Sequence, residues 1–295
     1  MSRLGDYWAI SKPRILYLLL VVAWSAMFVA AGGLPDWKPF VAVTLAGTFS
    51  VASSGAFNHV LERHKDARMS RTADRPVASG RLPVANAVAY GLITGALSFA
   101  SLAVIGLWLA AALTVGAILY YVIIYTVILK PTTPQNIVIG GFAGSFPALI
   151  GWAAQTGSLA WPAAAPALLL ALLVFLWTPA HFWALALLYK EDYAKAEFPM
   201  MPNVRGEEST RRQVAVYATL TVLCSFILVA TKDAGWLYAA AATLLGLYLV
   251  AKAALLVTTP SPKAYRSFFF LTIQYLGVLL LVLMLDRALG VATLG

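Results

Sequence analysis

The chain has 295 residues, of which 61% are hydrophobic and 11% are charged, and its formal net charge is +9. A soluble globular protein carries roughly 25% charged residues, so this composition excludes a soluble domain. The single cysteine, Cys224, excludes an intrachain disulfide and a thiolate metal site.

Apolar runs of about 20 residues, the length that crosses the hydrocarbon of a bilayer, recur along the chain. Nine such runs lie near residues 15–34, 40–61, 84–103, 106–128, 136–154, 163–189, 213–231, 234–257 and 268–287. The first run is too long for the apolar region of a signal peptide, and no small-residue cleavage site follows it. The pattern therefore predicts an all-α polytopic membrane protein, with nine transmembrane helices in one integral-membrane domain over residues 1–295.

The positive charge is distributed unevenly between the two sides of these runs. With the N-terminus inside, 18 of the 21 Lys and Arg residues lie on the cytoplasmic side, and the other three are Lys38, Lys232 and Arg287. This bias fixes the orientation and explains the basic charge without a nucleic-acid partner. The two long cytoplasmic segments, about 62–83 and 190–212, are four spans apart. They favour two similar helical halves around a central cleft that opens to the cytoplasmic side.

The end of the second run concentrates polar groups, because residues 58–76 read NHVLERHKDARMSRTADRP. Asn58, Glu62 and Asp66 are spaced by four residues, so on a helix they share one face. Two carboxylates and an amide on one face form an oxygen site suited to Mg²⁺. Arg71 and Arg75 follow, and arginines are forked donors for phosphate oxygens. The segment predicts a diphosphate site at the membrane surface; the alternative is a solvated charged loop.

Residues 125–151 form a second unusual stretch, in which Lys130 and Asn136 precede the glycines of the fifth run. Small residues let membrane helices pack closely, and this accounts for Gly140, Gly141, Gly144 and Gly151. Two interpretations of Lys130 and Asn136 stay open. Each side chain either reaches a phosphate group or caps and anchors a helix.

The sixth run continues into WTPAHFWALALLYKEDY at residues 177–193. On one continuous helix Trp177, His181 and Asp192 share a face, because Trp177 precedes His181 by about one turn and the eleven residues from His181 to Asp192 make just over three turns. An ionisable group inside a span is a functional candidate, since exposing it to lipid is costly. The alternatives are a hydrogen bond from His181 to a neighbouring helix, and a surface role for Asp192 near Lys190 and Lys195.

These stretches resemble the UbiA superfamily of intramembrane prenyltransferases. Residues 58–66 resemble its Asn-x-x-x-Asp-x-x-x-Asp region, with Glu62 where many members have Asp. MSRT at 69–72 with Arg75–Pro76, TPQNIVIGGFAG at 133–144 and WTPAHFWALAL at 177–187 resemble one branch, the protohaem IX farnesyltransferases. The resemblance covers nearly the whole chain, from about residue 7 to residue 275.

The resemblance implies transfer of a farnesyl group from farnesyl diphosphate to a vinyl group of haem b, with addition of water, giving haem O. It implies that Mg²⁺ is held by Asn58, Glu62 and Asp66. The diphosphate would be bound by the positively charged and amide side chains Arg71, Arg75, Lys130 and Asn136. The farnesyl length rests on the resemblance alone.

For the acceptor, the resemblance implies that His181 contacts haem as an axial iron ligand, a partner of a propionate or a partner of the incoming water. Trp177, Phe182 and Trp183 would stabilise a carbocation with their ring faces. Asp192 would bind a second Mg²⁺ or position water. The implied location is the bacterial cytoplasmic (inner) membrane, and a downstream haem-modifying oxidase is a partner that stays open.

Two further interpretations of the chain remain. The first is prenyl transfer to a quinone precursor or another aromatic acceptor, which is disfavoured because one Glu-Asp pair and a helix histidine stand where such enzymes carry repeated aspartates. The second is a non-enzymatic haem or lipid carrier. A carrier should tolerate Asp66→Asn with little loss of ligand binding.

Overall fold

In the computed structural model, residues 3–291 are described, so the first two and last four residues of the predicted domain lie outside the description. All regular secondary structure in the described part is helical, which confirms the all-α prediction. Nine segments within it are long and apolar enough to cross a membrane. The protein is therefore a multi-pass membrane protein.

Seven spans are single helices: α2 (Pro13–Ala31), α3 (Trp37–Asp66), α4 (Val84–Ala103), α9 (Ala165–Leu188), α12 (Glu207–Ala230), α13 (Trp236–Thr258) and α14 (Pro262–Ala288). Two spans are composite: α5 (Trp108–Leu119), η1 (Tyr120–Leu129) and α6 (Lys130–Thr132) form one, and α7 (Asn136–Gly140), η2 (Gly141–Ser145) and α8 (Phe146–Thr156) form the other. Short helices outside the spans are α1 (Arg3–Ile10), α10 (Lys190–Lys195) and α11 (Met201–Val204).

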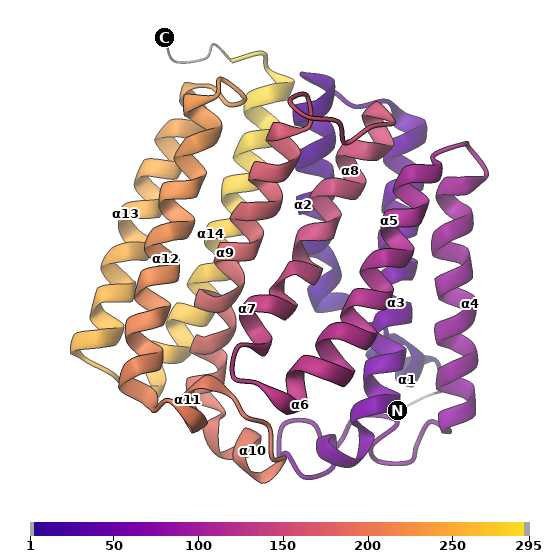
Figure 1. The fold of residues 1–295 in the computed structure, drawn as a ribbon, viewed down its shortest axis with the longest axis vertical. Helices are drawn as coiled ribbons and strands as arrows, with labels where there is room; N and C mark the ends of the chain where they lie inside the picture. The colour runs from indigo at the N-terminus through magenta and orange to yellow at the C-terminus, as the bar shows by residue number, and fades with distance from the viewer. Residues whose placement is uncertain (1–2, 292–295) are drawn as a thin grey trace.

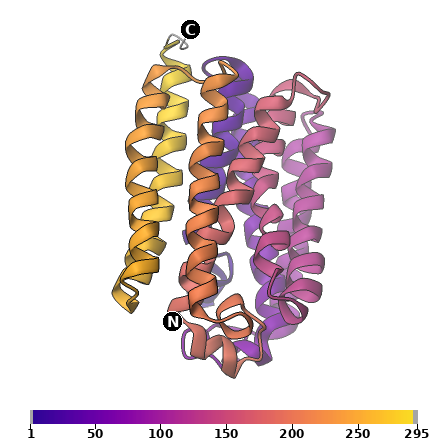
Figure 2. The same cartoon turned by 60° about the vertical axis from the view of Figure 1, so that its left-hand side comes forward.

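The spans form a closed ring in chain order. Each one packs against the next, and α14 packs back against α2. The helix α2 also contacts α8 and α9, so it lies toward the middle of the bundle. The helices run roughly parallel to one another in both views (Figure 1, Figure 2).

Two helices extend further into the polar segments than the sequence predicts. Helix α3 continues to Asp66 rather than ending near residue 61, and its last turn carries Arg63, His64 and Lys65. Helix α12 begins at Glu207 rather than near residue 213, with Glu207 and Glu208 in its first turn. Basic groups stabilise the C-terminal end of a helix and acidic groups its N-terminal end, which explains both extensions. The long connections therefore shorten to residues 67–83 and 189–206.

The polar segments gather at one end of the bundle. Helices α1, α6, α10 and α11 lie at the lower end in Figure 1, together with the 67–83 connection, whereas the last turns of α14 lie at the upper end. Because the described spans are odd in number, the chain enters the first span and leaves the last one on opposite sides. The lower end is the side that the charge pattern predicts to be cytoplasmic.

The composite spans pack more closely than larger side chains would allow. A Cβ atom at Gly140 would collide with the ring of Tyr125, and one at Gly151 would collide with the carbonyl oxygen of Ala23. These contacts confirm the close packing that the glycines predict. The facing segment η1 is a π-helix, in which the Thr126 hydroxyl donates to the carbonyl of Tyr121, five residues earlier, at 2.9 Å. Such wide turns are frequent at functional sites.

The orientation can be tested with single cysteines, because the native Cys224 is buried. Lys195→Cys lies at the lower end and Lys38→Cys at the start of α3, and both side chains are exposed. In right-side-out vesicles a membrane-impermeant maleimide should label Lys38→Cys and spare Lys195→Cys, and in inverted vesicles the pattern should reverse. The opposite labelling would contradict the predicted orientation.

Candidate active site

Three oxygen-bearing side chains line one face of α3 at its lower end. Asn58, Glu62 and Asp66 are 2%, 4% and 0% exposed. The four-residue spacing explains why they share the inward face. Buried polar groups of this kind need hydrogen-bonding or charged partners, because each one otherwise loses its hydration without compensation.

Each of these three groups has its own cation. Lys130 Nζ donates to Glu62 Oε1 at 2.5 Å. Arg75 Nη1 donates to both carboxylate oxygens of Asp66 at 2.9 and 2.8 Å, and lies 3.9 Å from Glu62 Oε2. Asn58 Oδ1 accepts a hydrogen bond from Lys12 Nζ at 2.6 Å. The structure thus places Lys130 and Arg75 beside the predicted metal ligands.

Lys12 was missed by the sequence analysis, where it counted only as one cytoplasmic positive charge. It joins α1 to α2 in a left-handed backbone conformation (φ 51°, ψ 52°), and Pro13 begins the following helix. Its Nζ also donates to the Tyr121 hydroxyl at 3.1 Å. Removal from water, followed by the nearby charge of Arg75, lowers the pKa of Lys12 from 10.5 to about 7. An anion placed beside this amine would favour its charged form.

Arg71 is held against two aromatic rings from the other polar connection. Its guanidinium carbon lies 5.3 Å from the centre of the Tyr189 ring and 6.0 Å from that of Tyr193. Its Nη2 donates to the Tyr193 hydroxyl at 3.4 Å. Cation–π contacts of this kind leave other guanidinium N–H groups available for an anion.

Asp192 connects the two polar segments. It accepts hydrogen bonds from the Ser70 hydroxyl at 3.0 and 2.8 Å and from the Arg71 backbone N–H at 3.2 Å. Burial raises the pKa of the Asp192 carboxyl, but these hydrogen bonds outweigh burial and hold the pKa below its usual value of 3.8. The carboxylate therefore stays ionised and fixes the backbone at Arg71.

The prediction that His181 and Asp192 share one helix face was wrong. Helix α9 ends at Leu188, and Tyr189 leaves the helical conformation (φ −113°, ψ 29°) before α10 begins. The break turns Asp192 toward Ser70 and Arg71, and it places Asp192 in the first turn of a new helix, where acidic groups are favourable. A proposed metal-binding role for Asp192 therefore needs partners from the 67–83 connection.

His181 lies between two aromatic rings. The Trp177 ring is 4.3 Å away with an interplanar angle of 12°, and the Phe269 ring is 4.5 Å away at 24°. Its Nδ1 is 2.8 Å from the hydroxyl oxygen of Thr272, whose backbone carbonyl accepts from Trp177 Nε1 at 2.8 Å. The predicted shared face of Trp177 and His181 is confirmed, and α14 completes the stack.

The remaining aromatic candidates divide between two surroundings. The centre of the Phe182 ring lies 6.4 Å from that of Tyr193, on the side of the Arg71 contact. Trp183 is fully buried and meets the Tyr217 ring of α12 edge-on at 5.5 Å. Trp183 is six residues after Trp177, so it projects from another side of α9.

Asn136 begins α7 and is completely buried. Its side-chain amide donates to the Thr133 carbonyl at 2.6 Å, which is the helix-anchoring alternative that the sequence left open. Its Oδ1 is buried and has no hydrogen-bond partner among residues 3–291. A buried acceptor without a donor is costly, so this oxygen is available to an incoming donor or cation.

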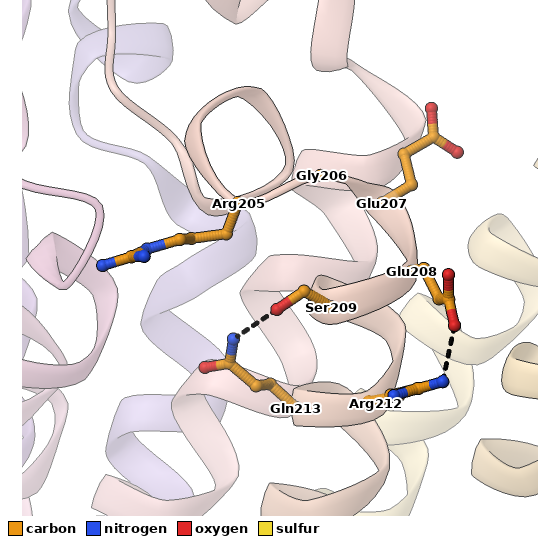
Figure 3. A pocket seen from close by; sticks show the side chains of 7 residues that line it. All are labelled: Arg205, Gly206, Glu207, Glu208, Ser209, Arg212 and Gln213. Carbon is orange, nitrogen blue, oxygen red and sulfur yellow. Dashed lines mark hydrogen bonds and ion pairs between the residues drawn. The ribbon is translucent and has the colours of Figure 1, made fainter.

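Two hollows lie at the lower end. One of about 540 Å³ is bordered by Ser70, Asp192 and Tyr265, and there Lys190 Nζ lies 2.9 Å from Glu207 Oε1. The other, of about 510 Å³, is lined by Arg205, Gly206, Glu207, Glu208, Ser209, Arg212 and Gln213. In this second hollow Arg212 pairs with Glu208, and Gln213 donates to Ser209 (Figure 3). These are local pairs within one helix, so the second hollow adds no chemistry to the site.

The UbiA prenyltransferase family model matches residues 18–274. The chain belongs to this family. It is 46% identical over 281 residues to protoheme IX farnesyltransferase 1 of Natronomonas pharaonis, covering 95% of this chain and 60% of that protein. It is 42% identical over 286 residues to the protoheme IX farnesyltransferase of Gloeobacter violaceus, covering 97% of this chain and 92% of that protein. The chain thus spans less than two thirds of the first relative and nearly all of the second.

Two solved structures share the UbiA fold with this chain. A digeranylgeranylglyceryl phosphate synthase has a TM-score of 0.77 and 16% identity, covering 98% of this chain and 99% of that one. A UbiA homolog from Archaeoglobus fulgidus, bound to GPP and Mg²⁺, has a TM-score of 0.64 and 16% identity, covering 95% and 99%. At this identity the likeness shows the fold alone.

The α3 face has the donor chemistry of a magnesium site in this UbiA fold. Among residues 3–291, no group of three or more His, Cys, Asp and Glu side chains could hold a metal. Glu62, Asp66 and the Asn58 amide therefore form an incomplete oxygen set, which suits Mg²⁺ because this ion is usually held by one or two carboxylates plus substrate phosphates and water. The donor set fits the ion, provided that Lys130 and Arg75 yield carboxylate oxygens to it.

The hydrogen bonds by which Asp192 holds Ser70 and the Arg71 backbone can be tested by hydrogen–deuterium exchange. Asp192→Ala should speed exchange of the Arg71 amide about tenfold, since it removes one hydrogen bond of roughly 1–1.5 kcal/mol. Glu191→Ala is the matched control, because Glu191 is the exposed neighbouring acid. An unchanged exchange rate in Asp192→Ala would show that Asp192 does not fix this segment.

Proposed function

We propose that this protein transfers a farnesyl group from farnesyl diphosphate to a vinyl group of haem b, with addition of water, giving haem O. The observation that carries the proposal is the buried set of Asn58, Glu62 and Asp66, each facing a cation, in a chain 42–46% identical to protoheme IX farnesyltransferases. We further propose Mg²⁺ as the metal and Asn58, Glu62 and Asp66 as its ligands. The metal would neutralise charge on the diphosphate.

The cations around this face support the diphosphate part of the proposal. Lys130 and Arg75 are held within hydrogen-bonding distance of the carboxylates, and Lys12 within that of the Asn58 amide. When a diphosphate is present, these donors can turn from the protein oxygens to phosphate oxygens. Hydrogen bonds from charged donors strengthen as negative charge develops on the leaving group. Arg71, from the same 67–83 connection as Arg75, adds further guanidinium N–H groups.

Asn136 and Asp192 take supporting roles in this proposal. The unpartnered Oδ1 of Asn136 accepts a hydrogen bond from substrate or from a substrate-bound water. Asp192 holds Ser70 and the backbone of Arg71, so it positions Arg71. Its second predicted role, binding a further Mg²⁺, requires release of the Ser70 hydroxyl.

The histidine stack supports the haem part of the proposal. His181 is partly exposed, and the rings of Trp177 and Phe269 fix its plane. Trp177 and Phe182 offer ring faces that stabilise a carbocation by about 1–2 kcal/mol in a dry site. Trp183 is enclosed against Tyr217, so we assign it to packing around the site rather than to substrate contact.

The proposed location is a bacterial cytoplasmic (inner) membrane, with the N-terminus and the polar segments facing the cytoplasm. Farnesyl diphosphate then places its charged group at the lower end of the bundle, and its apolar tail lies among the helices. This arrangement suits a substrate with one anionic end and one apolar end. A cleft opening toward this end is part of the proposal, because the α3 face itself is enclosed.

Purified protein incubated with haem b, farnesyl diphosphate and Mg²⁺ should yield a haem heavier by one farnesyl group plus one water, measured by mass spectrometry of the extracted pigment. A chelator should prevent its formation. If haem stays unmodified while aromatic acceptors are prenylated, the acceptor assignment is wrong. No product with either acceptor, from protein that still binds haem, would favour the carrier.

Asp66→Asn and Arg71→Ala should each lower this turnover by about 10²–10³-fold, because each removes a charged group directed at developing charge. The matched controls are Asp74→Asn and Arg68→Ala, whose side chains are largely exposed. Both controls should keep normal turnover, and thermal unfolding should confirm that all four variants are folded. Full turnover by Asp66→Asn would remove this carboxylate from the site.

A further inference from the structure

We propose that Thr272 is a positioning residue that fixes His181 in its Nδ1–H tautomer and thereby presents the lone pair of Nε2 to the haem iron. This inference rests on the proposed haem substrate for the iron contact, whereas the tautomer follows from the hydrogen bonds alone. Thr272 lies on α14, in a part of the chain that the sequence motifs do not cover, and it is completely buried.

The tautomer follows from the single proton of the Thr272 hydroxyl. This hydroxyl oxygen lies 2.6 Å from the Phe269 carbonyl oxygen and 2.8 Å from His181 Nδ1. Two oxygens at 2.6 Å repel each other unless a proton lies between them, so the hydroxyl donates to the carbonyl. The hydroxyl oxygen is then an acceptor, and Nδ1 must supply its own proton.

The second ring nitrogen is consequently left with its lone pair. No carboxylate contacts the His181 ring within residues 3–291, so nothing there stabilises a doubly protonated imidazolium. Within residues 3–291 the side-chain hydrogen bond of the His181 ring is made by Nδ1, the Phe269 backbone carbonyl also lies beside the ring, and the residue is partly exposed. A neutral Nδ1–H imidazole offers an unprotonated Nε2.

This assignment removes one of the three roles that the sequence left open for His181, and it is compatible with iron ligation and with a hydrogen bond accepted from water. An unprotonated Nε2 cannot donate to a propionate, so that role is excluded. Iron ligation needs the lone pair that is present. Histidines that bind metals almost always donate their other ring N–H to an oxygen acceptor, and Thr272 supplies this acceptor. The Trp177 and Phe269 rings prevent rotation of the imidazole, so the lone pair keeps one direction.

Thr272 also sets the position of the neighbouring ring. Its backbone carbonyl accepts a hydrogen bond from Trp177 Nε1 at 2.8 Å, while its hydroxyl oxygen accepts from His181. One residue of α14 thus fixes two successive members of the stack on α9. Replacement by Val keeps the carbonyl and the side-chain shape but removes the hydroxyl, so the effect on His181 can be separated from that on Trp177.

The tautomer can be measured directly, because the chain contains three histidines. Protein with ¹⁵N-labelled histidine rings is examined by NMR in detergent without haem, and the signals of His181 are those lost in His181→Gln. The expected wild-type pattern is a protonated Nδ1 and an unprotonated Nε2. Thr272→Val should shift His181 toward the Nε2–H form, and Thr272→Ser should restore the wild-type pattern. A protonated Nε2 in the wild type, or no change in Thr272→Val, overturns the proposal.

Haem titration of the same proteins tests the iron contact. Thr272→Val should weaken haem b binding by about 10- to 100-fold and lose the absorption signature of histidine ligation, with recovery in Thr272→Ser. Thr221→Val is the control, because Thr221 is equally buried and its hydroxyl donates to Tyr217 of its own helix. A wild-type complex without histidine ligation overturns the iron contact. If the wild type binds no haem, the proposed function fails together with the iron contact, while the NMR result stands separately.

Discussion

The enclosed face of α3 depends on the match between its oxygen groups and cations that come from three other segments of the chain. Ions lose most of their hydration inside a bundle, so two carboxylates there are tolerated only with close, hydrogen-bonded partners. Lys12 comes from the junction of α1 and α2, Arg75 from the 67–83 connection and Lys130 from the end of a π-helix. These ion pairs and hydrogen bonds therefore connect α3 with regions that are distant from it in the sequence.

The proposed sites for the diphosphate and for haem are built from different elements. Groups suited to a diphosphate come from α3, the 67–83 connection and the composite span, whereas the His181 stack comes from α9 and α14. Asp192 links the polar segments that follow α3 and α9. Arg71 with the two tyrosines beside it, and Lys130 over the Phe198 ring, are further contacts between these regions.

The all-α class, the nine spans and the shared face of Asn58, Glu62 and Asp66 were predicted from the sequence, because the length of an apolar run and a four-residue spacing are local properties. The sequence also predicted roles for Arg75, which follows the α3 carboxylates in a polar segment, and for Lys130, an isolated charge between two apolar runs. Lys12 and Thr272 were missed, since a lysine before the first span has an ordinary topological explanation and a threonine in a helix carries no distinctive pattern. The helix break at Tyr189 was missed as well; it accompanies contacts of Asp192 with a segment more than a hundred residues earlier, and such long-range contacts cannot be read from spacing along the chain.

The groups around α3 also determine the net charge that is enclosed in the bundle. Lys12, Arg75 and Lys130 are three cations facing the two carboxylates of Glu62 and Asp66, so with Lys12 protonated the enclosed set has one positive charge in excess. A diphosphate accompanied by one magnesium ion carries net negative charge. Its arrival would neutralise that excess rather than add charge to a low-dielectric interior, where uncompensated charge is most costly. Departure of the diphosphate would restore the excess, so the protein favours occupancy of this face by an anion at the start of each cycle.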